Sequence, residues 1–244
     1  MREEYPVIKE ECVDTVYDGR FVRVMDIRYA EGCHYLDATR RTKENIVAIK
    51  SDAEFKAMLP DAVTCIVIVK TGTEERLLMN YEYRYPAGRF LLSPVAGLID
   101  PEDCEYARTP DSTAAVSSNE DAALRREKAL LRAAAREIKE ETGITVGDSD
   151  RMHVLSPFTF STPGMTDESN ALVCAVITLP DVSILNHDGA VGSECFKGFE
   201  LLSKDEARKL LTAGCDKNGF FYSLHTYCAL MYFVNDMWKQ GGLV

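Results

Sequence analysis

Three glutamates fall within five residues of this chain, Glu137, Glu140 and Glu141, between Arg136 and Gly143. If the segment is helical, each residue advances about 100° around the axis, so Glu137 and Glu141 lie one turn apart on the same side. Like charges at this spacing repel one another. A divalent cation such as Mg²⁺, which prefers oxygen ligands, would offset that repulsion, so the cluster is a candidate metal site.

A solvated helix face is the competing interpretation of the same residues. Glutamates at this spacing are common on exposed helix surfaces, and Arg136 and Lys139 would neutralise part of their charge. On charge pattern alone the exposed face is the commoner outcome. The metal-site hypothesis therefore depends on other parts of the chain.

The glutamates are predicted to lie near the end of a long helix. A capping box, Ser117-x-x-Glu120, marks its start, and Gly143 can end it. Glu137 and Glu141 lie on one flank of the helix's predicted apolar stripe, so both would border the buried face. The stripe residues are Leu124, Leu131, Ala134, Ala135, Ile138 and Thr142.

Strands are expected on both sides of this helix. Residues 21–29 alternate as a half-buried strand does, and 35–39 and 46–49 extend an N-terminal antiparallel unit. Residues 63–70 form a continuous apolar run, typical of a buried central strand, with 76–81 as its hairpin partner. The remaining elements are a helix-like turn at 51–60, strands at 152–160, 171–179 and 199–202, and helices at 204–213 and 223–238. This pattern predicts an α/β (α+β) fold.

Composition limits the partners of the chain. Its 244 residues carry a formal net charge of −11, which argues against binding to nucleic acid or an anionic membrane. We find no apolar run near the length of a membrane span and no apolar core of a signal peptide. The eight cysteines contain no Cys-x-x-Cys pair, so we expect reduced thiols, no zinc site and a cytoplasmic protein.

The glutamate cluster resembles a known family motif. Arg136-Glu137-Ile138-x-Glu140-Glu141-x-Gly143-Ile144 matches the second half of the Nudix box, G-x5-E-x7-R-E-U-x-E-E-x-G-U, where U is aliphatic. Three more segments are similar to the ADP-ribose pyrophosphatase branch of that family, and the resemblance covers roughly residues 15 to 235. They are Tyr83-Arg84-Tyr85-Pro86, Pro94-x-Ala96-Gly97-Leu98-Ile99-Asp100 and Leu202-Ser203-x-Asp205-Glu206-Ala207. The resemblance implies a Nudix fold, a mixed sheet sandwiched between helices.

The resemblance also implies roles for the box residues. Glu137 and Glu141 match the glutamates that ligate Mg²⁺, and Mn²⁺ accepts the same ligands. Glu140 matches an added ligand or base. Ala96 matches a position whose backbone carbonyl ligates a metal. Gly97, the next residue, is a candidate substrate-binding residue. Arg136, which we group with the catalytic residues, matches the arginine that braces the motif by ion pairing.

Two further positions carry implied roles outside the box. Glu168, in a loop that contains Pro-Gly, corresponds to the catalytic glutamate of this branch, with Asp167 as the runner-up. Arg84 resembles a contact to the substrate phosphates. A surface salt bridge is the alternative interpretation of Arg84, since arginine suits both kinds of pairing.

The chain departs from the motif between Gly97 and Arg136, where it has about 25 additional residues. Counted back from Arg136, the first glutamate of the motif falls at Lys128. Glu127 is adjacent and Glu102 lies near the other end of the insertion, but neither fits the spacing. The polar insertion, at about 101–126, would act as a lid or specificity loop, or be a tolerated surface loop.

These observations lead to one functional expectation with two rivals. We expect Mg²⁺-dependent hydrolysis of the diphosphate of a nucleoside diphosphate sugar, with ADP-ribose giving AMP and ribose 5-phosphate. The rivals are hydrolysis of another nucleoside diphosphate derivative and a non-catalytic ligand-binding module. We expect residues 1–50 to form an N-terminal β unit that dimerises the protein, and 51–244 to form the Nudix domain.

Overall fold

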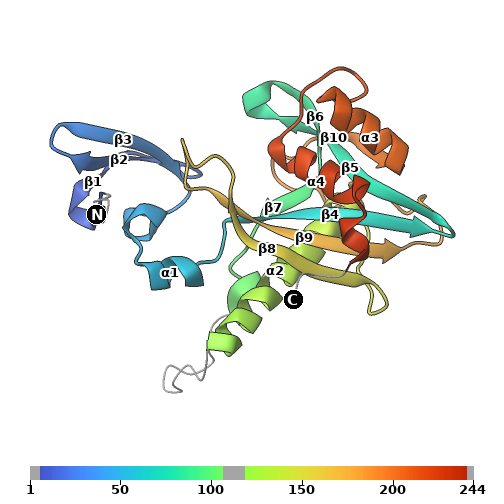
Figure 1. The fold of residues 1–244 in the computed structure, drawn as a ribbon, viewed down its shortest axis with the longest axis horizontal. Helices are drawn as coiled ribbons and strands as arrows, with labels where there is room; N and C mark the ends of the chain where they lie inside the picture. Colours follow the sequence, from blue (N-terminus) through green and yellow to red (C-terminus); the bar gives the residue numbers. More distant parts are fainter. Residues whose placement is uncertain (1–5, 107–118, 241–244) are drawn as a thin grey trace. The chain divides into compact units, whose positions relative to one another are not determined.

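The computed structural model describes residues 6–106 and 119–240, apart from the side chains of 105–121 (Figure 1). Two compact units make up the chain. The N-terminal unit combines Met1–Asp61 with Phe158–Asn170, and the box unit combines Ala62–Pro157 with Ala171–Val244. The N-terminal unit therefore includes a segment from far along the sequence as well as the predicted β unit.

The N-terminal unit is built on a three-stranded antiparallel sheet, in the order β1-β2-β3. Strands β1 (Val13–Asp18), β2 (Arg23–Ala30) and β3 (Cys33–Thr39) follow the short 3-10 turn η1 (Glu10–Cys12). Val13, Met25, Ile27 and Ile46 form its small core. Only the first residue of β1 is buried, so this strand lacks the alternation that predicted β2.

The strand expected at 46–49 is wrong. Two 3-10 turns, η2 (Lys43–Asn45) and η3 (Val47–Ile49), occupy this region, and only Ile46 between them is fully buried. A four-residue apolar run cannot be assigned to a strand or a turn by periodicity alone. The helix-like turn expected at 51–60 is confirmed as α1 (Asp52–Ala57), which begins with a capping box from Ser51 and Glu54.

The large sheet has seven strands, with β10-β5-β4-β9-β8 in order, β6 paired to β5 and β7 paired to β4. Their bounds are β4 Ala62–Thr71, β5 Glu74–Arg84, β6 Arg89–Ser93, β7 Val95–Leu98, β8 Arg151–Phe160, β9 Ser169–Thr178 and β10 Phe196–Leu202. Strand β4 is buried along eight consecutive residues, as its apolar run predicted. The 3-10 turn η4 (Tyr85–Ala87) joins β5 to β6.

Helices cover both faces of this sheet (Figure 1). Along β5, Asn80 contacts Glu141 of α2 (Asn119–Thr142), whereas Tyr81 packs in the core that includes Phe233 of α4 (Leu224–Val234). Neighbouring strand residues point to opposite faces, so α2 and α4 lie on opposite sides. Helix α3 (Lys204–Ala213) packs with α4. The predicted α/β class is confirmed.

Helix α2 buries a different stripe from the one expected. Leu124 is exposed, whereas Glu137 and Glu141 lie within the buried stripe and not at its border. The stripe consists of Ala129, Leu130, Ala133, Ala134, Glu137, Ile138, Glu141 and Thr142. The helix ends before Gly143, whose φ of 75° suits glycine, as predicted. The capping box at Ser117 lies outside the described residues.

The C-terminal helices follow their predicted starts. Ser203 and Glu206 form the capping box of α3, whose bounds are as expected. Helix α4 is shorter than predicted, because the chain turns at Asp236 with a φ of 57° into η6 (Met237–Lys239). Within the described residues, no helix combines the length and apolarity needed to cross a membrane.

Candidate active site

The centre of the candidate site is a pair of buried carboxylates on α2. Glu137 is 4% exposed and Glu141 is 2% exposed. One carboxylate oxygen of Glu141 accepts from the backbone N–H of Ala96 at 3.2 Å, and the other accepts from the side-chain amide of Asn80. Oε1 of Glu137 accepts from Nη1 of Arg136 at 2.8 Å. Both glutamates are therefore held by β5, β7 and their own helix.

Gly97 allows the strand β7 to approach α2 closely. A Cβ atom at this position would lie 2.1 Å from the carboxyl carbon of Glu137, so a larger residue would displace the glutamate. Antiparallel pairing with β4 holds Gly97 opposite Val63. The structure thus brings Ala96, Gly97, Glu137 and Glu141 together, although 40 positions separate Gly97 from Glu137 in the sequence.

Arg136 ties the end of β7 to the box helix. Its Nη1 donates to Glu137 at 2.8 Å and to Glu140 at 3.1 Å, and its Nη2 donates to the carbonyl oxygen of Leu98 at 2.8 Å. The carboxylate of Asp103 accepts from the same guanidinium at 2.9 Å. A planar guanidinium presents five donors, so one arginine can hold all these acceptors.

Asp103 is the acid that sequence spacing missed. It is 4% exposed, opens the 3-10 turn η5 (Asp103–Tyr106) and accepts from the backbone N–H of Asp100 at 3.0 Å. Counted forward from Gly97, Asp103 stands where G-x5-E requires its acid. The candidates near the motif spacing, Glu102, Glu127 and Lys128, are all exposed. The additional residues therefore follow Asp103, and the first half of the box is intact with aspartate in place of glutamate.

Burial controls the protonation of the two box glutamates. It raises the pKa of Glu137 to about 7, against the opposing effect of the Arg136 charge. The pKa of Glu141 is raised chiefly by burial, against its hydrogen bond from Ala96. A carboxylate removed from water is costly unless a cation or a hydrogen-bond donor compensates it. In the part of the chain that the structure describes, Arg136 is the one guanidinium that pairs with either of these two buried carboxylates.

The oxygen donors suit a hard divalent cation. Across the described ranges, no three His, Cys, Asp or Glu side chains are grouped so as to hold a metal ion by themselves. The donor chemistry nevertheless fits Mg²⁺ or Mn²⁺, which accept carboxylate and carbonyl oxygens. Glu137, Glu141 and the carbonyl of Ala96 would supply these donors, and the buried Asn80 amide oxygen beside Glu141 has no partner.

His187 supports the C-terminal end of the box helix. Its Nδ1 donates to the carbonyl oxygen of Glu141 at 2.7 Å, and its ring stacks on Phe199 at 3.9 Å between centroids. Gly189, on the same loop, lies so close to α2 that a Cβ would approach the Glu140 backbone at 2.6 Å. This contact could not be predicted from the sequence, because His187 has no neighbouring residues at the spacing of metal ligands.

Arg84 forms an ion pair in the structure. Its Nη2 lies 2.6 Å from a carboxylate oxygen of Glu82, and the Arg84 side chain is 44% exposed. Burial raises the pKa of Glu82, and the charge of Arg84 opposes that rise. Arg84 thus has a carboxylate partner and remains open to solvent, which is compatible with both of its interpretations.

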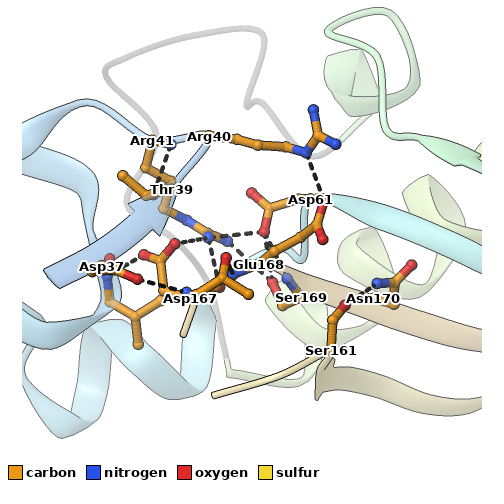
Figure 2. A network of polar contacts seen from close by, with 12 residues as sticks. Asp37, Thr39, Arg40, Arg41, Asp61, Ser161, Asp167, Glu168, Ser169 and Asn170 are labelled. Atoms are coloured by element: carbon orange, nitrogen blue, oxygen red, sulfur yellow. Dashed lines mark hydrogen bonds and ion pairs between the residues drawn. The ribbon is translucent and has the colours of Figure 1, made fainter. Parts of the chain in front are cut away.

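Glu168 and Asp167, the candidates for the loop base, belong to the N-terminal unit (Figure 2). The carboxylate of Glu168 is 30% exposed and accepts from Nε of Arg40 at 2.7 Å. Asp167 is 8% exposed, accepts from the backbone N–H of Val47 at 3.0 Å, and lies 3.5 Å from Nη1 of Arg41. Asp167 is therefore committed to internal contacts, and Glu168 is the more accessible carboxylate.

The backbone around Glu168 is held on both sides by Arg41 and Asp61 (Figure 2). Arg41, whose side chain is 9% exposed, donates to the carbonyl oxygen of Asp167 at 3.0 Å and to Oγ of Ser169 at 3.2 Å. Asp61 accepts from the backbone N–H of Ser169 at 2.9 Å and pairs with Arg41 at 2.8 Å. No local sequence pattern predicted this network.

Known proteins resemble this chain in sequence and in fold. No family profile matches the chain. Over 160 residues it is 24% identical to the Caenorhabditis elegans protein described as putative nudix hydrolase 2, covering 66% of this chain and 56% of that protein. The chain thus spans just over half the length of this relative.

Two solved structures resemble the chain. The crystal structure of an ADP compounds hydrolase superposes with a TM-score of 0.54 at 19% identity, covering 98% of both chains. A C. elegans Ap4A hydrolase binary complex gives a TM-score of 0.42 at 16% identity, covering 75% of this chain and 99% of that one. The first of these likenesses supports the fold. Together, the box residues on α2, the fold and the sequence relative make this chain similar to Nudix hydrolases.

Proposed function

We propose that this protein is a Mg²⁺-dependent Nudix hydrolase of the ADP-ribose pyrophosphatase branch, which cleaves nucleoside diphosphate sugars. ADP-ribose is the proposed substrate, and AMP and ribose 5-phosphate are the products. The observation that carries the proposal is the buried Glu137–Glu141 pair, packed against Ala96 and Gly97. Burying two carboxylates this way is unfavourable for stability, which indicates a functional reason for keeping them.

The box residues would hold and orient the reacting groups. Glu137, Glu141 and the Ala96 carbonyl would hold Mg²⁺ or Mn²⁺, which when bound neutralises the diphosphate and polarises its phosphoryl oxygens. Arg136 keeps Glu137 in place from one side, and Asn80 and the Ala96 N–H orient Glu141. Their contribution is to position these oxygens before substrate arrives.

Three further residues have proposed roles in the transfer itself. Glu168 accepts a proton from the attacking water, whose oxygen bonds to phosphorus as the bond to the bridging oxygen breaks. Arg84 contacts the substrate phosphates, and Glu140 acts as an added ligand or base. The ion pair with Nε of Arg40 holds the Glu168 carboxylate in place.

A substrate panel tests this function. The protein is incubated with Mg²⁺ and ADP-ribose, other nucleoside diphosphate sugars and dinucleotides, and the released phosphomonoesters are measured after phosphatase treatment. We expect the fastest release from ADP-ribose. Faster turnover of another compound would move the assignment within the class, and binding without turnover of any compound would support the alternative of a non-catalytic binding module.

The substitution Glu141→Gln tests the site directly. It preserves the shape and the acceptor for the Ala96 N–H but removes the charge, so we expect kcat to fall by at least about 100-fold. Glu127→Gln is the matched control, because Glu127 is an exposed glutamate on the same helix. Near-normal turnover in Glu141→Gln, with the thermal unfolding temperature unchanged, would exclude the proposed ligand role.

We also propose a cytoplasmic homodimer that assembles through the N-terminal unit. Large apolar side chains are exposed on its three strands and the β1–β2 connection, which supports a dimer interface there. All eight cysteines of the chain are free thiols, which supports the cytoplasmic location. Light scattering of Leu36→Glu should show a monomer, whereas the control Leu124→Glu on α2 should remain dimeric. The exposed side chains are Val16, Tyr17, Phe21, Val22, Tyr29, Tyr35 and Leu36.

A further inference from the structure

A groove of about 640 Å³ in the box unit combines aromatic and cationic side chains. It lies where β6, β5 and β10 meet the segment that follows α3. Few acidic residues contribute to it, although the whole chain has a net charge of −11. The groove is lined mainly by Tyr81, Tyr83, Arg89, Phe90, Lys197, Lys217 and Phe220.

The groove is separate from the box glutamates. Tyr81 and Tyr83 alternate along β5 with Asn80, which contacts Glu141, so the two tyrosines point to the opposite face of the sheet. Tyr83 pairs across to Phe90 of β6, and their rings meet edge to face at 5.3 Å. The β-sheet itself therefore lies between this aromatic wall and the candidate active site.

Each cation of the groove stands beside an aromatic ring. Arg89 lies 5.5 Å from the centre of the Phe220 ring, and Lys197 lies 6.0 Å from that of Phe90. Lys217 also forms an ion pair with Glu200. Among the described residues, Arg89 and Lys197 have no carboxylate within ion-pair distance, so both charges remain available to an anion.

The far wall of the groove is a preformed loop. Oδ1 of the buried Asp216 accepts from the backbone N–H groups of Asn218 at 2.8 Å and Phe220 at 2.9 Å. The N–H of Asp216 donates to the carbonyl oxygen of Phe220 at 2.8 Å, which closes the loop. Lys217 and Phe220 are thus presented on a backbone that is already ordered, so ligand binding need not order it.

We propose that this groove is a second binding site, which takes a nucleoside monophosphate. The aromatic wall offers faces and edges against which a planar base can pack. Arg89 and Lys197 offer N–H donors to a phosphate, and a guanidinium suits a phosphate by its planar fork of donors. A ligand with a flat ring and an anionic group matches these neighbouring aromatic and cationic side chains. The proposal does not depend on the hydrolytic function.

Calorimetric titration of the full chain with AMP tests the proposal. The buffer contains EDTA, so that metal-dependent binding at the box does not contribute. Adenosine and inorganic phosphate are titrated separately as the ring alone and the anion alone. The groove variant is Arg89→Gln/Lys197→Gln, and the matched control is Arg208→Gln/Lys209→Gln, which removes the same charge from α3. Glu141→Gln serves as the control for the active site.

We expect AMP to bind at least tenfold more tightly than adenosine or phosphate, and the groove variant to lose at least tenfold in affinity. The α3 control and Glu141→Gln should bind AMP as the original chain does. The proposal would be overturned if the groove variant bound AMP with the same affinity as the original chain. It would also be overturned if the original chain bound phosphate as tightly as AMP. Binding lost in Glu141→Gln alone would place the nucleotide at the box. An acidic peptide that binds the groove while AMP does not would likewise overturn it.

Discussion

At the scale of single residues, the candidate site depends on how Arg136 is held. Its guanidinium joins the carbonyl of Leu98, the carboxylate of Asp103 and two box glutamates. Asp103 is the most buried of its partners other than Glu137. The motif acid is therefore an aspartate, and the shorter side chain still reaches the arginine because the η5 turn brings its backbone close.

Asp103→Ala should destabilise the protein and reduce turnover together. Removing one partner of a largely buried pair costs about 3–5 kcal/mol, and the partial exposure of Arg136 reduces this to about 1–3 kcal/mol. Urea unfolding measures the change. Asp100→Ala is the control, because that carboxylate is 52% exposed and lies 3.5 Å from Arg136. Equal losses for the two variants would contradict the special role of Asp103.

At the scale of elements, the β8–β9 connection is held by the segment that follows β3 within the N-terminal unit. Two consecutive arginines after β3 have different partners. Arg41 donates to the backbone carbonyl of Asp167 and to the side-chain hydroxyl of Ser169, on the two sides of Glu168. Arg40 is 40% exposed and binds the Glu168 carboxylate. With Glu168 in its proposed role as the base, such support positions its carboxylate more precisely. We infer that Arg41 is a positioning residue.

Arg41→Ala and Arg40→Ala should therefore differ. Arg41→Ala leaves Asp61 and Asp167 without their cation and should lower the free energy of unfolding by about 3–5 kcal/mol. Arg40→Ala breaks an exposed pair and should cost at most about 1 kcal/mol. Arg41→Lys keeps the positive charge but loses the planar guanidinium with its paired N–H donors. It should therefore be more stable than Arg41→Ala, while its kcat should still be lower than that of the original chain and its KM little changed. Identical kinetics in Arg41→Lys would contradict the positioning role.

At the scale of the whole molecule, stability should depend on pH through the buried acids of the N-terminal unit. Burial raises the pKa of Asp37 to about 6, and the nearby Asp167 charge adds to the rise. Between about pH 4 and pH 6, the unfolded chain binds fewer protons at Asp37 than the folded chain does. The free energy of unfolding should therefore fall as pH rises through this window, by about 1–3 kcal/mol.

Asp37→Asn should flatten this dependence. The amide keeps an oxygen to accept from the backbone N–H of Asp167, a hydrogen bond of 3.0 Å, but it cannot ionise. Urea unfolding between pH 4 and pH 7 measures the slope. Asp52→Asn removes the same charge at an exposed position of α1 and should leave the slope unchanged. An unaltered slope in Asp37→Asn would show that another group causes it.

Local patterns determined much of this protein. Ser203 and Glu206 begin α3 where the capping box predicts, Gly143 ends α2, and the continuous apolar run becomes the buried strand β4. These signals depend on contacts between residues a few positions apart, which the sequence displays directly. The place of the box glutamates on a helix could be predicted for the same reason, whereas their proposed role came from the resemblance to the Nudix box.

Only the tertiary structure decided how distant segments meet. The pairing of Asp103 with Arg136 spans the insertion, and the contacts of Arg41 with Asp167 and Ser169 join residues more than 120 positions apart. No local periodicity encodes such pairs, since they form when strands and loops pack and buried charges require partners. The sequence by itself determined the residues of the box and their helical spacing, and the tertiary structure decided which residues surround and support them.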